Sequence, residues 1–288
     1  MSVLGVSPAA IHERAYAKVN LILHVGRRRG DGLHPLCSIF ASIDLHDDVS
    51  VEPAESGGDH VECAGLDAPN LAAAALASFR RRVPELPALR VSIEKRIPVA
   101  AGLGGGSADA AAVLRAANRV AGDPLGAAAL REVGAELGSD VPSQVDPHHA
   151  LVSGVGEMVD PLDLPPFGVV FVPQEVGLST AAVYAEFDRL GGGRQTLDLD
   201  ALRALGREMA LLPVLANDLQ PAALALRPEL GAVLASLRAA GALGALVSGS
   251  GPTCFGLFED RAAAGAAAAK IDGAAYAALR SGRSPLLP

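Results

Sequence analysis

The strongest constraint on the fold is a run of four glycines in five positions, Gly102-Leu103-Gly104-Gly105-Gly106, followed by Ser107. It lies between an alternating segment at 89–97, typical of a strand, and an alanine-rich segment with helical periodicity. Glycines permit positive φ and leave no Cβ in the way, so successive N–H groups can converge on an anion. A helix starting at Ser107 would add free N–H groups and its dipole. We predict a phosphate-binding loop, in which Ser107 caps the helix or faces a metal-bound phosphate; a tight packing turn is the alternative.

Two common phosphate motifs do not fit this loop. The pattern GxGxxG, counted from Gly102, would need a glycine where the chain has Ser107. The P-loop needs a Gly-Lys dipeptide, which the sequence does not contain. The loop therefore belongs to another type of phosphate site.

The remaining pattern predicts strands and helices in mixed order, which is typical of the α+β class. We expect two domains, 1–155 and 156–288. The expected strands are 14–25, one or two within 38–51, 89–97, 167–173, a pair around the Gly-rich turn of 242–260, and a short one at the end. The expected helices are 70–82, from 107 onward, 125–137, 179–190, 198–209, 213–225, 228–240 and 260–271.

Composition excludes several classes of protein. With 24 basic and 32 acidic residues the net charge is −8, which argues against binding to nucleic acid through an overall positive field. Cys37, Cys63 and Cys254 have neither CxxC nor zinc-site spacing, which suggests a reduced, cytoplasmic protein. Residues 239–258 carry no charge, but the central SGSGP would break a helix in lipid, so we expect no membrane span.

Three polar residues stand out as candidates for chemistry. Lys18 is a lone lysine in the apolar segment AKVNLIL; facing inward it must be paired, although a surface lysine is the alternative. Asn20 is two residues further, on the same face of the strand. Asp140 follows a helix that ends at Gly138 and could act as a base toward an alcohol, or merely cap the next turn.

Four segments together resemble one family. PVAAGLGGGSADAAAVL (98–114) resembles the ATP-phosphate motif of GHMP kinases, and its GGGSADAA part resembles the 4-diphosphocytidyl-2-C-methyl-D-erythritol kinases. AKVNLILHVGRRRGDGLHPLCSIF (17–40), LGSDVP (137–142) and LVSGSGPTCFGLF (246–258) resemble three other motifs of that family, in the same order.

The resemblance implies a two-domain GHMP kinase fold, with an N-terminal domain like ribosomal protein S5 domain 2 and a ferredoxin-like C-terminal domain. It implies transfer of phosphate from ATP, with Mg²⁺, to the 2-hydroxyl of CDP-methylerythritol in the non-mevalonate isoprenoid pathway. Asp140 would be the base and Lys18 would stabilise charge. We expect a monomer or homodimer whose partners are these small molecules.

The resemblance also implies a set of binding residues. For ATP they are Asn70, Pro98, Val99, Ala100, Ala101, Gly102, Leu103, Gly104, Gly105, Gly106, Ser107 and Ala108, with Ser107 also a candidate Mg²⁺ contact. For the acceptor they are Asn20, His34, Tyr184, Ser248, Gly249, Ser250, Gly251 and Thr253. Asp109 could assist the metal or complement the helix dipole.

The sequence departs from the family in two places. Leu33 replaces the tyrosine before the pocket histidine, and Tyr184 or Phe187 could supply the missing aromatic surface. Residues 143–150 lack the family's aromatic pair and paired glycines. Their adjacent His148 and His149 would point opposite ways on a strand, which disfavours a metal site. The alternatives are therefore a GHMP kinase of another alcohol, such as homoserine, mevalonate or a sugar, or a non-catalytic nucleotide-binding paralogue.

Overall fold

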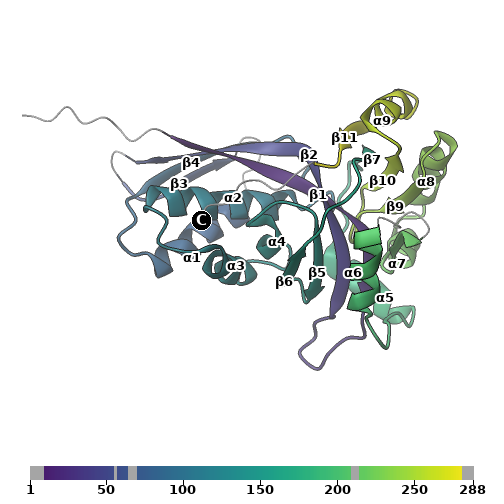
Figure 1. The fold of residues 1–288 in the computed structure, drawn as a ribbon, viewed down its shortest axis with the longest axis horizontal. Coiled ribbons are helices and arrows are strands. Elements are labelled where there is room, and N and C mark those ends of the chain that lie inside the picture. Colours follow the sequence, from purple (N-terminus) through teal and green to yellow (C-terminus); the bar gives the residue numbers. More distant parts are fainter. Residues whose placement is uncertain (1–9, 55–56, 64–69, 209–213, 281–288) are drawn as a thin grey trace, which may run out of the picture.

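The computed structural model describes residues 10–54, 57–63, 70–208 and 214–280. Within these ranges the chain forms a seven-stranded and a four-stranded sheet, with helices packed against both (Figure 1). The mixed α+β architecture predicted from the sequence is confirmed.

The first sheet is built on two long antiparallel strands, β1 (Ile11–Val25) and β2 (Leu36–Pro53). On its other edge β2 pairs with β4 (Leu89–Glu94) through its second half and with β5 (Ala150–Gly154) through its first half. The short outer strands are β3 (His60–Cys63), β6 (Met158–Pro161) and β8 (Ala216–Asn217), which pair with β4, β5 and β1.

Helices cover one face of this sheet because alternate strand residues are apolar there. The helices on this side are α1 (Leu71–Arg82), α2 (Gly105–Val120), α3 (Ala127–Ala135) and the single turn α4 (Val141–Gln144). α1 begins as predicted, with the side chain of Asn70 accepting the N–H of Ala73 at 3.0 Å. α2 packs on β1, β2 and α1, and its alanine-rich sequence permits this close approach.

The second sheet is antiparallel, in the order β11 (Ala275–Ala278), β7 (Gly168–Val172), β10 (Cys254–Phe258), β9 (Gly244–Val247). This is the strand order of a ferredoxin-like domain. α8 (Leu230–Ala239) and α9 (Arg261–Ala268) pack on it, and α5 (Thr180–Arg189), α6 (Leu199–Glu208) and α7 (Gln220–Leu226) complete the described helices.

A shared hydrophobic core joins the two sheets. Leu21 and Ile39 of the first sheet belong to the same buried cluster as Phe171 and Phe255 of the second. Because burial of apolar area is the main stabilising term in folding, this contact fixes the two sheets against each other. The edge of the contact, along β1, is where the candidate site forms.

Some predicted elements differ from the structure. Segment 38–51 lies within one strand rather than two, and β3, which begins at His60, was not expected. The helix predicted at 213–225 is confirmed only in its second half, as α7: residue 213 lies outside the described ranges, and β8 precedes α7. The side chain of Asn217 donates to the carbonyl of Gly249 and that of Asp218 accepts the N–H of Val25, which keeps residues 216–217 in strand β8 and delays the helix until Gln220.

Two further expectations concern larger features. The predicted division at 155/156 falls between the paired strands β5 and β6, and it stays a prediction. Segment 239–258 forms the end of α8, then β9, a turn and β10. Among the described residues, none of the helices has the length and apolarity needed to cross a membrane.

Candidate active site

Two glycines of the glycine-rich loop adopt the left-handed backbone conformation and closely approach neighbouring segments. Gly102 and Gly104 both have φ of +74°. A Cβ on Gly102 would lie 2.5 Å from the carbonyl oxygen of Ser248, and one on Gly104 would lie 3.0 Å from Cγ of Lys18. The loop is therefore pressed between the Ser248–Thr253 turn on one side and β1 on the other.

The helix after the loop starts earlier than predicted. Gly104 is the N-cap and α2 begins at Gly105, so the expectation that the glycine cluster lies outside the helix and that Ser107 caps it is wrong. The left-handed turn at Gly104 supplies the cap conformation without a side-chain hydrogen bond. Ser107 is left in the first turn, with its hydroxyl on the wall of a cavity.

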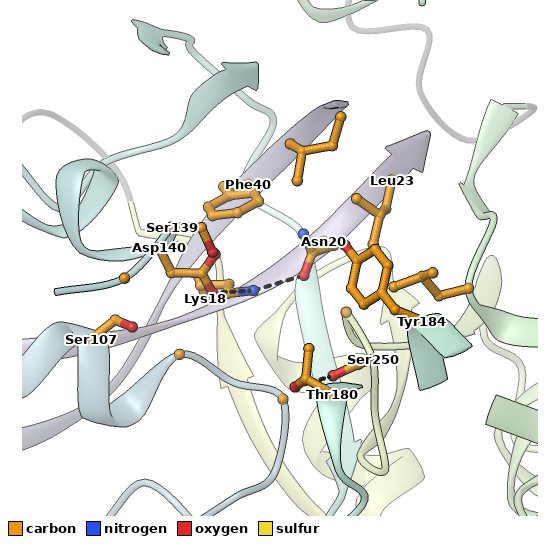
Figure 2. Close-up of a pocket in the computed structure, with 16 residues that line it drawn as sticks. Lys18, Asn20, Leu23, Phe40, Ser107, Ser139, Asp140, Thr180, Tyr184 and Ser250 are labelled. Carbon is orange, nitrogen blue, oxygen red and sulfur yellow. Dashed lines mark hydrogen bonds and ion pairs between the residues drawn. The ribbon is translucent and has the colours of Figure 1, made fainter. Parts of the chain in front are cut away.

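Lys18 and Asp140 form an ion pair at the centre of this cavity (Figure 2). Nζ of Lys18 lies 3.0 Å from Oδ2 of Asp140 and 2.9 Å from Oδ1 of Asn20, and 4.5 Å from the ring centre of Phe40. The Lys18 side chain is 6% exposed, so the predicted pairing of a buried lysine is confirmed. The carboxylate is 29% exposed, so it can be reached from the cavity.

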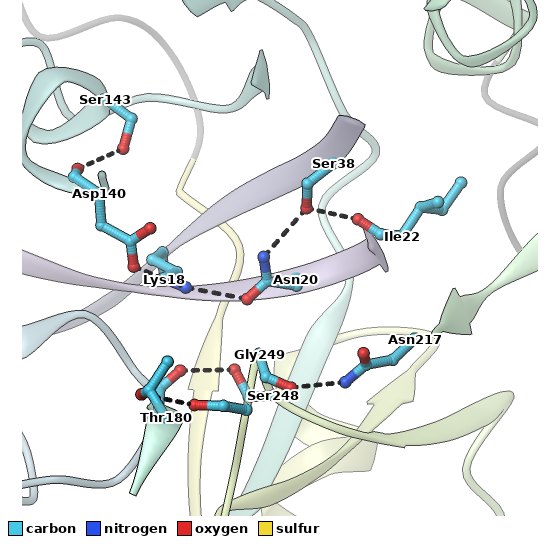
Figure 3. Close-up of polar contacts among 12 residues, drawn as sticks. Lys18, Asn20, Ile22, Ser38, Asp140, Ser143, Thr180, Asn217, Ser248 and Gly249 are labelled. Carbon is cyan, nitrogen blue, oxygen red and sulfur yellow. Dashed lines mark hydrogen bonds and ion pairs between the residues drawn. The ribbon is translucent and has the colours of Figure 1, made fainter. Parts of the chain in front are cut away.

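Asp140 is positioned by the single turn α4. It is the N-cap residue of α4, but its side chain makes no capping hydrogen bond, which leaves the carboxylate free for Lys18. The hydroxyl of Ser143 donates to the carbonyl of Asp140 at 2.8 Å (Figure 3). Buried Arg115, on α2, donates to the carbonyl of Gln144 at 2.7 Å. The helix that follows the glycine-rich loop therefore also fixes the turn that carries the carboxylate.

The segment that departs from the family pattern packs behind this turn. His149 accepts the N–H of Ser42 at Nδ1 (3.1 Å) and donates from Nε2 to the carbonyl of Arg280 (2.8 Å). Burial lowers the pKa of His149 to about 4, which keeps the ring neutral. The two histidines thus belong to the interior rather than to the cavity.

Asn20 is oriented by a short chain of hydrogen bonds (Figure 3). Its amide donates to Oγ of Ser38 at 3.0 Å, and Ser38 donates to the carbonyl of Ile22. Its carbonyl oxygen therefore faces Lys18, and all three side chains are buried. This arrangement holds the lysine ammonium toward Asp140.

The turn at 248–253 closes the far side of the cavity. Gly249 and Ser250 border it, and Ser250 exchanges a hydrogen bond of 2.9 Å with Thr180. Oγ of Ser248 donates to the carbonyl of Gly102 at 2.9 Å, and Asn217 donates to the carbonyl of Gly249 at 2.7 Å. Ser248 thus supports the loop.

Like Ser248, the predicted residues Gly251 and Thr253 do not border the cavity. Thr253 is fully buried, and its N–H donates to Ala101. Of the predicted ATP residues, Gly102, Gly104 and Ser107 border the cavity, whereas Asn70 caps α1, whose first residue Leu71 lies against Gly106.

A second pocket opens from the first. The cavity around Lys18 has a volume of about 260 Å³, and the neighbouring pocket about 580 Å³. Both are bordered by Leu36, Ser139, Thr180 and Tyr184. A ligand can therefore lie with one end in the second pocket and the other at Asp140.

The second pocket contains the predicted His34. Its Nδ1 is 3.0 Å from the carbonyl of Gly26 and its Nε2 is 3.3 Å from Asp188. Tyr184 lies 5.1 Å from the imidazole, ring centre to ring centre, and borders both pockets. Burial, with the negative charge of Asp140, raises the pKa of Tyr184 to about 12, so the phenol stays protonated.

The remaining aromatic and apolar candidates differ in exposure. Phe187 is buried edge-on against His34 at 5.9 Å and does not border the pocket. Leu33, at the mouth, is 51% exposed. Tyr184 is therefore the aromatic ring that a ligand in this pocket would meet.

Sequence reasoning missed several residues of the site. They are Phe40, Ser139, Thr180, Asp188 and Asn217, which lie beside the predicted residues or hold them. Asp188 could have been found, because it is four residues after Tyr184 and shares its helix face. The others carry no signal, since their roles depend on contacts between distant segments.

The donor set suits Mg²⁺ bound mainly by phosphate and water. Mg²⁺ takes oxygen ligands, and the hydroxyl of Ser107 and the carboxylate of Asp140 both border the cavity. Within the described ranges no cluster of three or more His, Cys, Asp or Glu side chains could hold a metal. Asp109 does not border the cavity and instead pairs with Lys95 at 2.7 Å.

Comparison with known proteins identifies the family. Residues 70–148 match the GHMP kinases N terminal domain, and residues 196–278 match GHMP kinases C terminal. The 4-diphosphocytidyl-2-C-methyl-D-erythritol kinase of Thermobifida fusca (strain YX) is 45% identical over 287 residues, covering 93% of this chain and 94% of the relative. The chain belongs to this family of GHMP kinases. The relative of the same name from Nocardia farcinica (strain IFM 10152) is 42% identical, with 98% and 96% covered.

A solved structure agrees with this family membership. The crystal structure of a 4-(cytidine 5'-diphospho)-2C-methyl-D-erythritol kinase superposes on this GHMP kinase with a TM-score of 0.82 and 36% identity. The match covers 94% of this chain and all of that one. The predicted two-domain GHMP kinase fold is confirmed, and membership of a kinase family implies that ATP is the phosphate donor.

Proposed function

We propose that this kinase transfers the γ-phosphoryl group of ATP to the 2-hydroxyl of 4-diphosphocytidyl-2-C-methyl-D-erythritol, a step of non-mevalonate isoprenoid synthesis. One observation carries the proposal: the Lys18–Asp140 pair lies between the glycine-rich loop and a second, larger pocket lined by His34 and Tyr184. The names of the relatives support the acceptor.

The donor side is served by backbone groups. Phosphoryl transfer has a loose transition state, so catalysis depends mainly on positioning and neutralising charge. The N–H groups of the loop and the first turn of α2 would hold the phosphates, with Ser107 as an additional donor. Mg²⁺, when bound, would neutralise charge on the β- and γ-phosphates.

The acceptor hydroxyl would be activated by Asp140. As the bond from the hydroxyl oxygen to Pγ forms and the bond from Pγ to ADP breaks, the hydroxyl proton passes to the carboxylate of Asp140. Lys18, held by Asn20, pairs with that carboxylate and would stabilise negative charge on the oxygen.

The second pocket would hold the cytidine end of the acceptor. The ring of Tyr184 offers a flat surface for a base, and the imidazole of His34, whose nitrogens face Gly26 and Asp188, lies beside that ring. Gly249 and Ser250 border the passage from the opposite side. Leu33 contributes apolar contact without an aromatic face.

The test is release of ADP by the purified chain with Mg²⁺-ATP. The acceptors compared are CDP-methylerythritol, homoserine, mevalonate and none, with Asp140→Asn alongside. We expect ADP only with CDP-methylerythritol, and a fall in kcat of about 10²- to 10⁴-fold in Asp140→Asn, the usual contribution of a general base. Unchanged ATP-analogue binding and unfolding temperature in that variant show that the site is intact.

Two other outcomes would replace the proposal. Turnover with another alcohol would keep the kinase and change the acceptor, and the exposed Leu33 at the pocket mouth is the residue that would explain it. ATP binding without ADP release from any acceptor would indicate a non-catalytic nucleotide-binding protein.

A further inference from the structure

A buried cluster of three charges lies beside the start of α2, outside the reaction just described. Nζ of Lys95 is 2.5 Å from Oδ2 of Asp47 and 2.7 Å from Oδ2 of Asp109. The Asp47 side chain is 0% exposed, and the other two are nearly buried. All three lie in the described part of the chain, and none borders either pocket. Buried charges are costly, so a cluster without substrate contact requires an explanation.

Asp47 binds the segment that enters the glycine-rich loop. Its Oδ1 accepts the backbone N–H groups of Arg96 (2.5 Å) and Ile97 (2.8 Å), and its Oδ2 accepts the ammonium of Lys95. Three consecutive residues between β4 and the loop are thus held by one carboxylate on β2. Such bonds to an ionised group are stronger than neutral ones.

The same cluster binds the segment that leaves the loop. Asp109 lies in α2, four residues after its first residue Gly105, and Lys95 bridges it to Asp47. The contact is tight: a Cβ on Gly105 would lie 2.9 Å from Ile97 and 3.4 Å from Nζ of Lys95. The Asp47–Lys95–Asp109 cluster therefore holds both ends of loop 98–104 together.

The charges in this cluster depend on one another. Burial raises the pKa of Asp109 to about 7, although Lys95 opposes the rise. Burial alone would lower the pKa of Lys95, but Asp109 and Asp47 raise it. Oδ1 of Asp109 is buried without a hydrogen-bond partner, so Lys95 is the contact that holds this carboxylate.

We propose that Asp47 is a positioning residue for ATP binding: through Lys95 and the amides of Arg96 and Ile97 it holds the loop in the shape that receives the phosphates. The inference rests on the assignment of the loop to ATP in the proposed function. Neither Asp140 nor the His34 pocket contacts the cluster. Loss of Asp47 therefore weakens ATP binding and leaves the chemical step and the acceptor site in place.

The test compares Asp47→Asn with Asp48→Asn. Asp48 is the next residue of the same strand, but its side chain is 42% exposed and pairs with Arg96 at the surface, so it is a matched control for the charge change. An asparagine at 47 would replace one carboxylate oxygen by an NH₂ group, which cannot accept a hydrogen bond from Lys95 or from the N–H groups of Arg96 and Ile97. We expect Asp47→Asn to raise the KM for ATP about tenfold, with kcat and the KM for CDP-methylerythritol changed less than about threefold. Asp48→Asn should change kcat and the two KM values by less than about twofold relative to wild type.

Other patterns would overturn the proposal. A purely structural defect would lower the apparent kcat because less of the protein is folded, or it would raise the KM for ATP and the KM for CDP-methylerythritol equally. If Asp47→Asn does not fold, Asp109→Asn decides: a rise confined to the KM for ATP supports the proposal, and an unchanged value refutes it. If the wild-type chain does not turn over the acceptor, the proposed function fails. Calorimetric affinity of the same variants for Mg²⁺-AMP-PNP then tests the role of Asp47, and equal affinity in Asp47→Asn and Asp48→Asn refutes it.

Discussion

Replacing Gly104 by alanine tests whether the glycine-rich loop places the lysine of the active site. Gly104 has φ of +74°, and its missing Cβ would lie 3.0 Å from Cγ and 3.1 Å from Cε of Lys18. The backbone of Lys18 cannot retreat, because its N–H donates to the carbonyl of Leu103 at 2.9 Å. The Lys18 side chain must therefore yield, although its ammonium is held by Asp140 and Asn20.

Two separate costs follow from this geometry. An alanine in the left-handed region costs about 1–2 kcal/mol, which lowers Tm by roughly 2–6 °C for a chain of this size. Carbon atoms prefer about 3.5–4.0 Å, so the new methyl pushes Lys18 by about 0.5 Å. Since a misplacement of about 1 Å can cost about 100-fold in rate, we expect kcat to fall about tenfold.

Gly122, just beyond the other end of α2, is the matched control. Its φ is +81°, and nothing lies within 4 Å of its absent Cβ. Gly122→Ala should lower Tm by a similar amount and leave kcat unchanged. Thermal unfolding and steady-state ADP release on both variants decide the matter. Equal kcat in Gly104→Ala and Gly122→Ala would refute the placement of Lys18 by the loop.

Two further predictions concern stability and the acceptor. His149 has a folded-state pKa of about 4 against about 6.5 unfolded, so the unfolded chain takes up the proton first as pH falls. The free energy of unfolding should therefore drop by up to about 3 kcal/mol between pH 6.5 and 4. Urea unfolding of wild type and His149→Gln at a series of pH values checks this. If the free energy of unfolding fell equally with pH in both proteins, the prediction would be contradicted. Tyr184→Leu should raise the KM for CDP-methylerythritol about tenfold and leave the KM for ATP unchanged, whereas Tyr184→Phe, which keeps the ring, should have little effect. Equal KM values for CDP-methylerythritol in the two Tyr184 variants would show that no base stacks there.

The residues proposed to carry the chemistry could be picked out from the sequence because each breaks the pattern of its own segment. Lys18 interrupts an apolar strand, and burial of its ammonium requires a partner wherever the chain folds. The glycines of 102–106 fit neither a regular strand nor a typical helix interior, so a special backbone was expected. The structure adds that Lys18 and the loop are in direct contact.

The residues that hold this chemistry could not be predicted in the same way. Asp47 and Asp48 are adjacent identical side chains, and only the pairing of β2 with β4 decides which one is buried beside Lys95. The start of α2 at Gly105 likewise depends on packing against Ile97. The low helix propensity of glycine opposes a helix start at this residue. Such roles arise from contacts between segments far apart in the chain.

The two pockets share Leu36, Ser139, Thr180 and Tyr184, but the rest of each comes from different stretches of chain, and this affects how such an enzyme can evolve. Apart from Ser139 and Val155, the larger pocket is formed by residues 28–36, around the β1–β2 connection, and by α5. The glycine-rich loop, Lys18 and Asp140 come from elsewhere. Substitutions at positions that border only the larger pocket, such as Leu33, can therefore accumulate without touching the glycine-rich loop, Lys18 or Asp140.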